Sequence, residues 1–384
     1  MHRTRRTAAV LLAAAVAVVV GIAPAGAAAG GRTGGDPSPV QRELTALVTG
    51  TGVPGAVAHT GHGRRGETYT AGTAELGSGR PMVGAEGRFR IASVTKSFTA
   101  AAVMRLVADG DLRLDDPAGR HVPQLAESGV TVRQLLKQTS GLADFGELVD
   151  WTRPGGYTPE EFLELSLRLG QEFAPGTDWG YSNTNYLVLG LVIEHVTGED
   201  FRVHVERTVI EPLGLRDTYW PAPGELGLRG PHARNYGYHP ARPQDGVVDV
   251  TEMPGYEFGA SGGLVSTPED LNTFWDGLLG GRLLPGWAVR LMTRDTTDVS
   301  DHGYPEGSRY GYGVRSNPLS CGGEYWGHLG DLPGDSVVAG RASGGRGAAT
   351  VYITSHHALD PARGEHLLAA VDAALCVKGH PNRP

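Results

Sequence analysis

The order of strand-like and helix-like segments limits this chain to few folds. Short runs rich in strand-forming residues predict two strands near the start and four near the end, at 56–60, 68–74, 310–314, 324–328, 336–339 and 348–353. Helical spacing dominates between them, and also at 38–49 and 367–375. We therefore expect an α/β fold, with an antiparallel sheet assembled from both ends of the chain, flanked by helices, and an inserted all-helical lobe.

The length of the chain predicts two lobes. Its 384 residues exceed the ~250–300 at which a single hydrophobic core stops growing. We expect one domain at 38–378, in which an α/β lobe takes about 38–115 and 255–378 and the helical lobe takes about 116–254. The Gly-rich leader at 28–37 is expected to be a flexible linker.

Local signals mark where several helices begin and end. Thr158-Pro159-Glu160-Glu161 combines a capping threonine, a proline suited to the first helical position and a glutamate three residues after the cap. Thr267-Pro268-Glu269-Asp270 repeats this start signal. A further helix is expected over 185–196, ended by Gly198.

Residues 1–27 have the pattern of a secretory signal peptide. Three arginines precede an apolar run at 8–20, and small residues around 25–27 form an A-x-A cleavage pattern. The alternative is a membrane anchor, but the apolar run is shorter than the ~20 residues that span a bilayer. The Arg5-Arg6 pair also suits twin-arginine export. We expect a secreted, extracellular protein with no stable membrane anchor after cleavage.

Charge and cysteine content narrow the partners and the compartment. The net charge of −8 becomes three units more negative when residues 1–27 are removed, which argues against a nucleic-acid partner. The two cysteines are Cys321 and Cys376, and an oxidising compartment would join them in a disulfide, with two unpaired thiols as the alternative. We expect a monomer that uses no cofactor and no metal.

Ser93-Val94-Thr95-Lys96 carries the strongest chemical signal. It lies where a predicted strand gives way to an apolar helical face that runs to Gly110. Residues i and i+3 share one face of a helix, so the Lys96 amine would lie beside the Ser93 hydroxyl. A serine needs such a base to become a nucleophile, and a helix start favours negative charge on its oxygen. The alternative is a helix-capping serine followed by an exposed lysine.

Two weaker motifs follow in the chain. Tyr181-Ser182-Asn183 lies in a predicted loop just before a helix, and a tyrosine near a lysine ammonium can be held partly as phenolate. The other motif, His328-Leu329-Gly330, follows a predicted strand, and its glycine allows close approach of the backbone to a ligand. Taken alone, neither motif is specific, and a surface turn explains Y-x-N equally well.

In this order, S-x-x-K, Y-x-N and H-x-G resemble the three motifs of penicillin-recognising serine enzymes, which include class C β-lactamases and D-Ala-D-Ala carboxypeptidases. The resemblance covers most of the chain after residue 27 and includes the segments 89–98, 131–136, 140–142, 181–185 and 212–215. It looks closest to the secreted carboxypeptidases of actinomycetes, which also share counterparts of 310–315, 319–321, His328 and Cys376. The resemblance implies a β-lactamase-like fold.

The resemblance also implies a role for the residues of these motifs. Ser93 would form the acyl-enzyme, with Lys96 and Tyr181 managing its proton. Asn183 would bind the amide of the substrate. His328 would line the opposite wall of the site and support Tyr181 electrostatically.

Further substrate contacts follow from the same resemblance. The backbone N–H groups of Ser93 and Asp331 would form the oxyanion hole beside Gly330. Arg315 matches an arginine that helps to receive the terminal carboxylate of a peptide.

One departure from the family pattern bears on the substrate. The carboxypeptidases have His-Thr-Gly-Thr where this chain has Asp331 in the last position, and Asp335 stands where the relatives have an aromatic residue. An ionised Asp331 would repel a substrate carboxylate. The expected activity is that of a D-alanyl-D-alanine carboxypeptidase on small peptidoglycan-type peptides. The alternatives are a β-lactamase, an esterase or D-amino-acid amidase of the same family, and an inactive penicillin-binding sensor.

Two other patterns compete with this interpretation. Gly259-Ala260-Ser261-Gly262-Gly263 matches G-x-S-x-G, and Asp301 and His328 follow in α/β-hydrolase order. Such an elbow needs a strand before it and a helix after it, whereas Met253-Pro254-Gly255 precedes this one. His356 and His357 are adjacent rather than four residues apart, so they do not form the usual zinc-binding helix pattern.

Overall fold

The structure, a computed structural model, describes residues 36–150, 153, 156–254 and 258–376. The predicted signal peptide at 1–27 and residues 28–35 of the predicted leader lie outside the described residues. So do the predicted lobe boundaries at 255 and 378.

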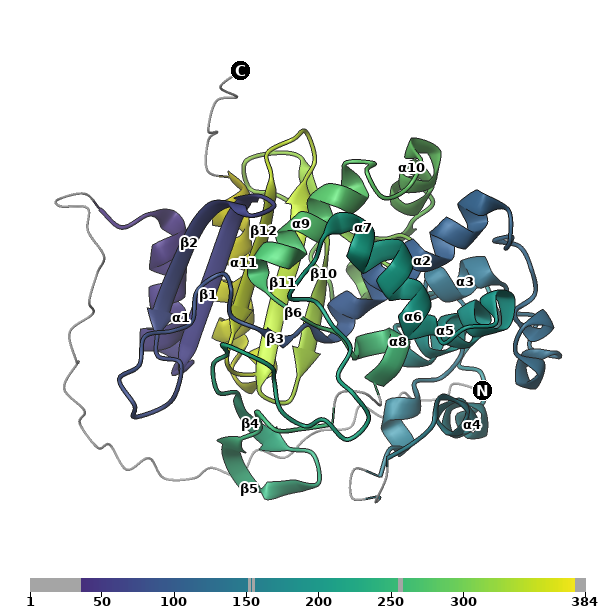
Figure 1. The fold of residues 1–384 in the computed structure, drawn as a ribbon, viewed down its shortest axis with the longest axis horizontal. Helices are drawn as coiled ribbons and strands as arrows, with labels where there is room; N and C mark the ends of the chain where they lie inside the picture. The colour runs from purple at the N-terminus through teal and green to yellow at the C-terminus, as the bar shows by residue number, and fades with distance from the viewer. Residues whose placement is uncertain (1–35, 151–152, 154–155, 255–257, 377–384) are drawn as a thin grey trace, which may run out of the picture. The chain divides into compact units, whose positions relative to one another are not determined.

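An eight-stranded antiparallel sheet joins the two ends of the described chain (Figure 1). Its order is β2-β1-β12-β11-β10-β9-β8-β7. The N-terminal strand β1 pairs with the C-terminal strand β12, so that Ala56 lies opposite Ile353. The strands are β1 (Gly55–His62), β2 (Arg65–Gly72), β7 (Thr297–Asp298), β8 (Arg309–Tyr310), β9 (Arg315–Pro318), β10 (Glu324–Leu332), β11 (Asp335–Ala342) and β12 (Ala348–Ile353). The predicted antiparallel sheet is confirmed.

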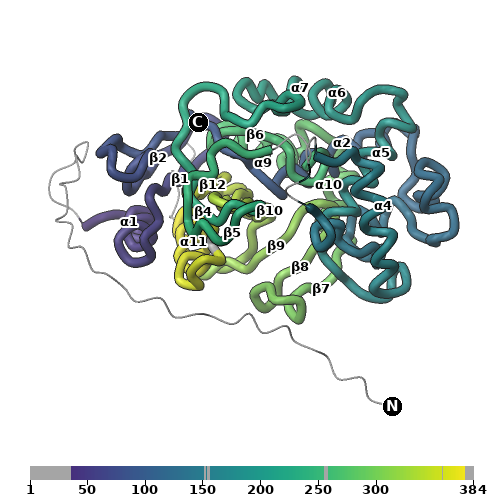
Figure 2. Tube along the Cα trace, turned by 90° about the horizontal axis from the view of Figure 1, so that it is seen from below, coloured from purple at the N-terminus to yellow at the C-terminus, as the bar shows by residue number. Residues whose placement is uncertain are grey.

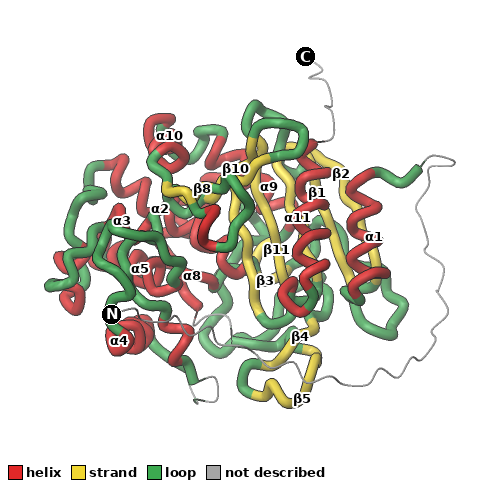
Figure 3. Tube along the Cα trace, turned by 180° about the vertical axis from the view of Figure 1, so that it is seen from behind, coloured by secondary structure: helices red, strands yellow, loops and turns green. Residues whose placement is uncertain are grey.

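Helices cover both faces of this sheet. Successive side chains of a strand point to opposite faces, and in β1 the side chains of Ala56 and Ala58 pack with one core while Val57 packs with the other. Helices α1 (Pro39–Thr51) and α11 (Pro361–Cys376) cover the first face, which Figure 3 shows in front. Helix α9 (Pro268–Leu279) covers the second face (Figure 1).

The remaining helices gather beside the β10 side of the sheet, as Figures 1 and 2 show. Helix α2 lies among them and packs against α5, α6 and α8. They are α2 (Thr95–Asp109), α3 (Val132–Leu136), α4 (Pro159–Leu169), α5 (Asn183–Thr197), α6 (Phe201–Val205), α7 (Glu211–Leu213), α8 (Gly259–Gly262) and α10 (Gly286–Arg294). Their apolar residues share one continuous core with the second face of the sheet.

The boundary predicted between the two lobes needs correction. The segment 116–254 contains a hairpin, β4 (Tyr236–His239) and β5 (Arg242–Asp249), so it is not all-helical. Tyrosine and valine favour strands, and Tyr238 pairs with Val247 across the hairpin. Conversely, α2 and α8 belong to the helical layer although they were assigned to the α/β lobe. The two-stranded pair β3 (Phe89–Arg90) and β6 (Val265–Ser266) leads into this layer.

A turn replaces the strand predicted at 310–314. Strand β8 ends at Tyr310, and Gly313 has a φ of 67°. A Cβ on Gly313 would lie 2.5 Å from the Ala100 side chain and 3.0 Å from the Lys96 carbonyl oxygen. This turn therefore packs directly on helix α2, which a strand with side chains would not allow.

The predicted helix starts are present. Thr158 and Glu161 form a reciprocal capping box at α4, and the Thr267 hydroxyl accepts from the Asp270 N–H at the start of α9. Helix α5 begins at Asn183, two residues earlier than predicted, and Gly198 ends it. None of the helices in the described ranges is long and apolar enough to cross a membrane.

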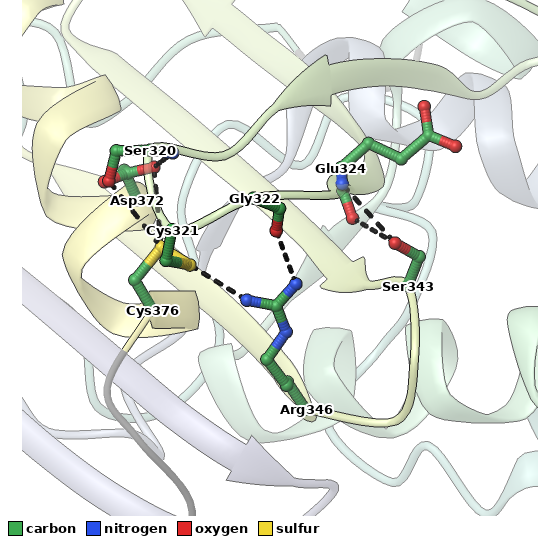
Figure 4. Close-up of a disulfide and its surroundings, with 8 residues drawn as sticks. All are labelled: Ser320, Cys321, Gly322, Glu324, Ser343, Arg346, Asp372 and Cys376. Carbon is green, nitrogen blue, oxygen red and sulfur yellow. Dashed lines mark hydrogen bonds between the residues drawn. A yellow bond between two sulfur atoms is a disulfide. The ribbon is translucent and has the colours of Figure 1, made fainter.

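The predicted disulfide between Cys321 and Cys376 is present (Figure 4). It joins the turn between β9 and β10 to the last residue of α11. Beside it, Ser320 donates to Asp372 through its N–H at 2.8 Å and its hydroxyl at 2.5 Å. The Arg346 guanidinium contacts the Cys321 sulfur at 2.9 Å. These contacts fix the C-terminal helix against the sheet.

Candidate active site

Ser93 lies in a single 3₁₀ turn, Ala92–Val94, between β3 and α2. The residue before it, Ala92, has a φ of 46°, a left-handed conformation that costs energy for a residue with a side chain. The Ile91 N–H donates to the Leu264 carbonyl at 3.0 Å, which ties the turn to the segment before β6. The backbone is thus held in a strained form directly at the predicted nucleophile.

Three buried hydroxyls anchor the first turns of α2. Thr95 accepts from the Leu264 N–H at 3.2 Å. Ser97 donates to the Gly313 carbonyl at 2.6 Å, and Thr99 donates to the Ala260 carbonyl at 2.7 Å. The helix is therefore fixed to α8, to the segment before β6 and to the turn after β8.

Lys96 is fully buried and faces three oxygen atoms. Its Nζ lies 3.0 Å from Ser93 Oγ, 2.7 Å from Asn183 Oδ1 and 2.8 Å from the Ser261 carbonyl oxygen. An amide oxygen and a backbone carbonyl oxygen can only accept hydrogen bonds, so two N–H bonds of Lys96 are committed to them. The third tetrahedral position points at Ser93.

Burial lowers the pKa of Lys96 from its ordinary value to about 7, although the carboxylate of Asp144 acts in the opposite direction. Near neutral pH a large share of Lys96 is therefore a neutral amine. With two N–H bonds committed to Asn183 and Ser261, the lone pair of that amine points at the Ser93 hydroxyl. The geometry suits removal of the serine proton.

Asn183 links Lys96 to a carboxylate that sequence reasoning missed. Its Nδ2 donates to Asp144 Oδ2 at 2.9 Å, and its backbone N–H donates to the same oxygen at 3.0 Å. The other oxygen of Asp144 accepts from the Gly146 N–H at 2.8 Å. The amide oxygen of Asn183 is thereby left to face Lys96.

The phenol ring of Tyr181 also lies near Lys96, whose Nζ is 4.9 Å from the centre of the ring. Burial raises the pKa of Tyr181 well above its ordinary value, while a hydrogen bond with Ser93 acts in the opposite direction. The partial phenolate expected from the sequence is therefore not favoured. Tyr181 is a protonated phenol beside Ser93, which can donate a proton.

His328 lies in β10 and is uncharged. Burial and the charge of Lys96 lower its pKa to about 3. Its Nδ1 lies 2.6 Å from the Leu329 carbonyl oxygen, and its Nε2 lies 3.2 Å from the hydroxyl of Tyr310. The expected electrostatic support of Tyr181 thus cannot come from an imidazolium, although the two rings are 6.3 Å apart.

The end of β10 touches the turn that carries Ser93. A Cβ on Gly330 would lie only 2.3 Å from the Ile91 carbonyl oxygen, so glycine permits this approach. The next residue, Asp331, accepts from the Ser336 hydroxyl at 2.5 Å. The two expected oxyanion donors, the N–H groups of Ser93 and Asp331, therefore belong to segments in contact.

A pocket of about 280 Å³ opens onto these residues. Arg315, almost fully buried at the start of β9, has its guanidinium carbon 4.5 Å from the centre of the Tyr304 ring. A cationic and an anionic side chain thus share a largely aromatic wall. The pocket is lined by Ser93, Tyr181, Asn183, Tyr304, Tyr310, Arg315, His328, Leu329 and Asp331.

Asp335 lies apart from the pocket lining. It opens β11, is almost fully buried, and accepts from Asn235 Nδ2 at 2.8 Å. Burial raises its pKa to about 8. No group of three or more histidine, cysteine or acidic side chains suited to a metal ion occurs in the part of the chain that the structure describes.

The family model described as "Beta-lactamase" matches residues 40–374, which include the whole of this site. The chain belongs to the beta-lactamase family. It is a serine hydrolase of the superfamily that also contains penicillin-binding proteins. The suspected family and the expected fold are thereby confirmed.

Two curated members of this superfamily match part of the chain. Esterase EstB of Burkholderia gladioli is 37% identical over 164 residues, which are 38% of this chain and 41% of the esterase. Penicillin-binding protein 4* of Bacillus subtilis is 30% identical over 154 residues, 39% of this chain and 34% of that protein. The aligned region thus spans less than half the length of either relative.

Two solved structures match nearly the whole fold. A D-stereospecific amidohydrolase from Streptomyces sp. has a TM-score of 0.76 and 34% identity, covering 88% of this chain and 98% of the other. A D-amino acid amidase from Ochrobactrum anthropi SV3, complexed with L-phenylalanine amide, has a TM-score of 0.75 and 30% identity, covering 87% and 97%.

The competing Ser261 elbow is not assembled in this family member. Ser261 lies in the single turn of α8, where its hydroxyl donates to the Phe258 carbonyl at 2.8 Å. Both ring nitrogens of His328 contact other groups, Leu329 and Tyr310. Ser261 contributes to the site through its backbone carbonyl, which accepts from Lys96.

Sequence reasoning missed Asp144, Tyr304, Tyr310 and the Ser261 carbonyl. Asp144 follows the segment Ser140-Gly141-Leu142, which resembles the family, and could have been found there. Tyr310 begins the Tyr310–Arg315 segment that resembles the carboxypeptidases, but the sequence predicts a substrate contact only for Arg315 in this segment. Tyr304 and the carbonyl of Ser261 carry no local signal, because tertiary contacts alone bring them to the site.

Proposed function

We propose that this protein is a D-stereospecific amidohydrolase that cleaves amides of D-amino acids through an acyl-enzyme on Ser93. Neutral Lys96 removes the Ser93 proton while Oγ attacks the substrate carbonyl carbon. The N–H groups of Ser93 and Asp331 stabilise the resulting oxyanion. Tyr181 then donates its proton to the leaving nitrogen, the C–N bond breaks, and the phenol is reprotonated from Lys96. The same amine then deprotonates water, which attacks the ester carbonyl carbon. As the ester C–O bond breaks, the ammonium of Lys96 returns a proton to Ser93 Oγ.

One observation carries this choice of substrate: Asp331 lines the same pocket as Ser93. A carboxylate there favours a substrate that has a free ammonium beside the scissile carbonyl, as a D-amino-acid amide does. The aromatic walls formed by Tyr304 and Tyr310 suit an apolar side chain. Similarity to the amidohydrolase and amidase structures over nearly their full length supports the same class of reaction.

A substrate panel tests this proposal. We expect release of ammonia from D-phenylalanine amide at a kcat/KM at least ~100-fold above that for the L enantiomer, because one enantiomer alone can present both groups correctly. Asp331→Thr should reduce kcat/KM for D-phenylalanine amide ~10–100-fold and should reduce it less for its N-acetyl derivative. Equal values of kcat/KM for the two enantiomers would contradict the proposal. So would a value of kcat/KM for D-phenylalanine amide that Asp331→Thr leaves unchanged.

A second candidate is the D-alanyl-D-alanine carboxypeptidase activity predicted from the sequence, and Arg315 favours it. Arg315 lines the same pocket, and a guanidinium can pair with a terminal carboxylate. Release of D-alanine from an acyl-D-Ala-D-Ala peptide, together with persistent labelling by a fluorescent penicillin, would support this candidate over the amidase. Rapid turnover of the penicillin would instead indicate a β-lactamase. Labelling without turnover of any substrate would indicate the sensor.

We also propose that the protein is exported by residues 1–27. The disulfide between Cys321 and Cys376 supports an oxidising compartment. Expression with and without residues 1–27, followed by fractionation of cells and medium, tests this. Full-length protein should reach the medium in a shortened form, and retention of the unshortened chain in the cytoplasm would contradict the proposal.

A further inference from the structure

The orientation of the Asn183 amide is settled by its neighbours. A carboxylate can only accept hydrogen bonds, so the atom that faces Asp144 Oδ2 at 2.9 Å must be the NH₂ group. The amide oxygen therefore faces Lys96 Nζ at 2.7 Å. Asp144 also accepts from the Asn183 backbone N–H, so one carboxylate oxygen holds this residue at two points.

The opposite orientation would disable the base. With the amide turned over, the NH₂ group would face Lys96 and would donate to the lone pair of its neutral amine. That lone pair would then no longer point at Ser93 Oγ, which lies 3.0 Å away. The Ser261 carbonyl would still accept one N–H of Lys96, so the other N–H would turn to Ser93 Oγ, which would accept it instead of giving up its proton.

We propose that Asp144 is a positioning residue that fixes the amide of Asn183 and thereby points the lone pair of Lys96 at Ser93. This inference rests on the proposed function, in which Lys96 is the base for Ser93. Asp144 itself does not line the substrate pocket. It acts on the reaction through Asn183, and the second N–H of the Asn183 amide stays available to the substrate.

Asp144 is itself held firmly. The carbonyl of the preceding residue, Ala143, accepts hydrogen bonds from three buried hydroxyls on α4 and at the start of α5, those of Ser166, Ser182 and Thr184, at 2.7, 3.2 and 2.7 Å. The second oxygen of Asp144 accepts from the Gly146 N–H. The carboxylate is thus placed before any substrate arrives, as a positioning role requires.

The negative charge of Asp144 affects the pH dependence of the rate, which a merely structural role of this residue would not change. Lys96 faces the rings of Tyr181 and Tyr186, the uncharged ring of His328, and the carboxylate of Asp144 beyond Asn183. The negative charge favours the ammonium form and raises the pKa of Lys96 against the effect of burial. Its removal should lower that pKa further, so that the acidic limb of the rate profile moves to lower pH.

The test measures kcat/KM for p-nitrophenyl acetate against pH in Asp144→Ala, Asp144→Asn and wild type. Both variants should move the acidic limb down by about 0.5–1 pH unit, since both remove the charge. On the plateau, Asp144→Ala should lose ~10–100-fold, and Asp144→Asn less because it retains an acceptor. Glu147→Gln is the matched control, an exposed carboxylate of the same loop, and should leave the profile unchanged.

A double-mutant cycle separates positioning from folding. If Asp144 acts through Asn183, then Asp144→Ala combined with Asn183→Ala should be no slower than Asn183→Ala alone. Fully additive losses, or an acidic limb that does not move, would overturn the inference. If Asp144→Ala does not fold, the position of the acidic limb in the pH profile of Asp144→Asn tests the inference instead. The Ser93→Ala variant is measured in parallel, because activity that survives in it would overturn the proposed function itself.

Discussion

At the scale of single residues, the site depends on a lysine that is uncharged at a useful pH. Its three neighbours are oxygen atoms, and two of them can only accept hydrogen bonds. Burial makes the ammonium unfavourable and brings the pKa of Lys96 to about 7. Burial keeps Lys96 neutral, and its hydrogen bonds point its lone pair at Ser93, so no charged histidine is needed to activate the serine.

The rate should therefore rise with pH through about 7 in the wild type, because the neutral form of Lys96 is the active one. Lys96→Arg keeps a permanent charge and should lose ~100–10,000-fold in kcat/KM for p-nitrophenyl acetate. The comparison of pH profiles for wild type and variant checks this. A wild-type profile that is flat between about pH 5 and 9 would contradict the assignment.

The contact between Ser93 and Lys96 could be predicted from the sequence because they lie three residues apart at a helix start. The placement of Tyr181, Arg315 and His328 around one pocket could be predicted because each lies in a segment that resembles the family. The protonation states of Tyr181 and His328 could not be predicted from the sequence, because they depend on burial and on groups that distant segments contribute.

At the scale of elements, the approach of β10 to the Ser93 turn decides whether the site can form. Gly330 lies against Ile91, and Gly313 lies against α2. The sequence predicted β10 as a strand but ended it at His328, four residues early. The extension exists because β11 pairs with β10 as far as Leu332, in a hairpin closed by Pro333 and Gly334. A Pro-Gly pair is a turn signal, so the true end of β10 could have been predicted from the sequence.

Gly330→Ala should separate β10 from this turn. The new Cβ would lie 2.3 Å from the Ile91 carbonyl oxygen, and overpacking of this kind costs ~1–3 kcal/mol of unfolding free energy. We expect kcat/KM to fall ~10–100-fold as well, because the oxyanion donors move apart. Urea unfolding and kinetics check both effects. Gly50→Ala, in α1 at a position with nothing within 4 Å, is the control: it should leave kcat/KM unchanged and should stabilise the fold, if anything, because alanine favours a helix.

Asp335 at the start of β11 should make stability depend on pH. Its pKa in the folded protein, about 8, is above its ordinary value of 3.8, so the folded state favours the protonated acid. The bound proton therefore adds to the free energy of unfolding. This stabilisation is fully present below about pH 4 and is lost as pH rises toward about 8. Asp335→Asn has no such proton, so its melting temperature should fall less between pH 5 and 9. Parallel curves for variant and wild type would contradict this.

At the scale of the whole molecule, strands from the two ends of the described chain lie in one sheet, and a disulfide joins the last residue of α11 to the turn between β9 and β10. One sheet built from both ends was expected from the strands predicted there, although the pairing of β1 with β12 was not. The pairing of Cys321 with Cys376 was expected from their number. The two predicted lobes do not have separate cores, because apolar residues of α2, α5 and the sheet belong to one continuous core. Sequence patterns show which face of an element is apolar, but not which partner covers it.

Replacing both Cys321 and Cys376 by serine should lower the unfolding free energy by about 4 kcal/mol, because the bond closes a loop of 55 residues in the unfolded chain. Urea unfolding with and without reductant measures this. Reductant should bring the wild type to the level of the variant and leave the variant unchanged. A variant as stable as the wild type would show that the bond does not constrain the chain.

The central claim, that Ser93 is the residue acylated, is tested most directly by acid-quenched mass spectrometry after mixing with p-nitrophenyl acetate. We predict one acetyl group on the peptide that contains Ser93, in the wild type and in Ser261→Ala alike, and none in Ser93→Ala. Acetylation that persists in Ser93→Ala and disappears in Ser261→Ala would contradict the account.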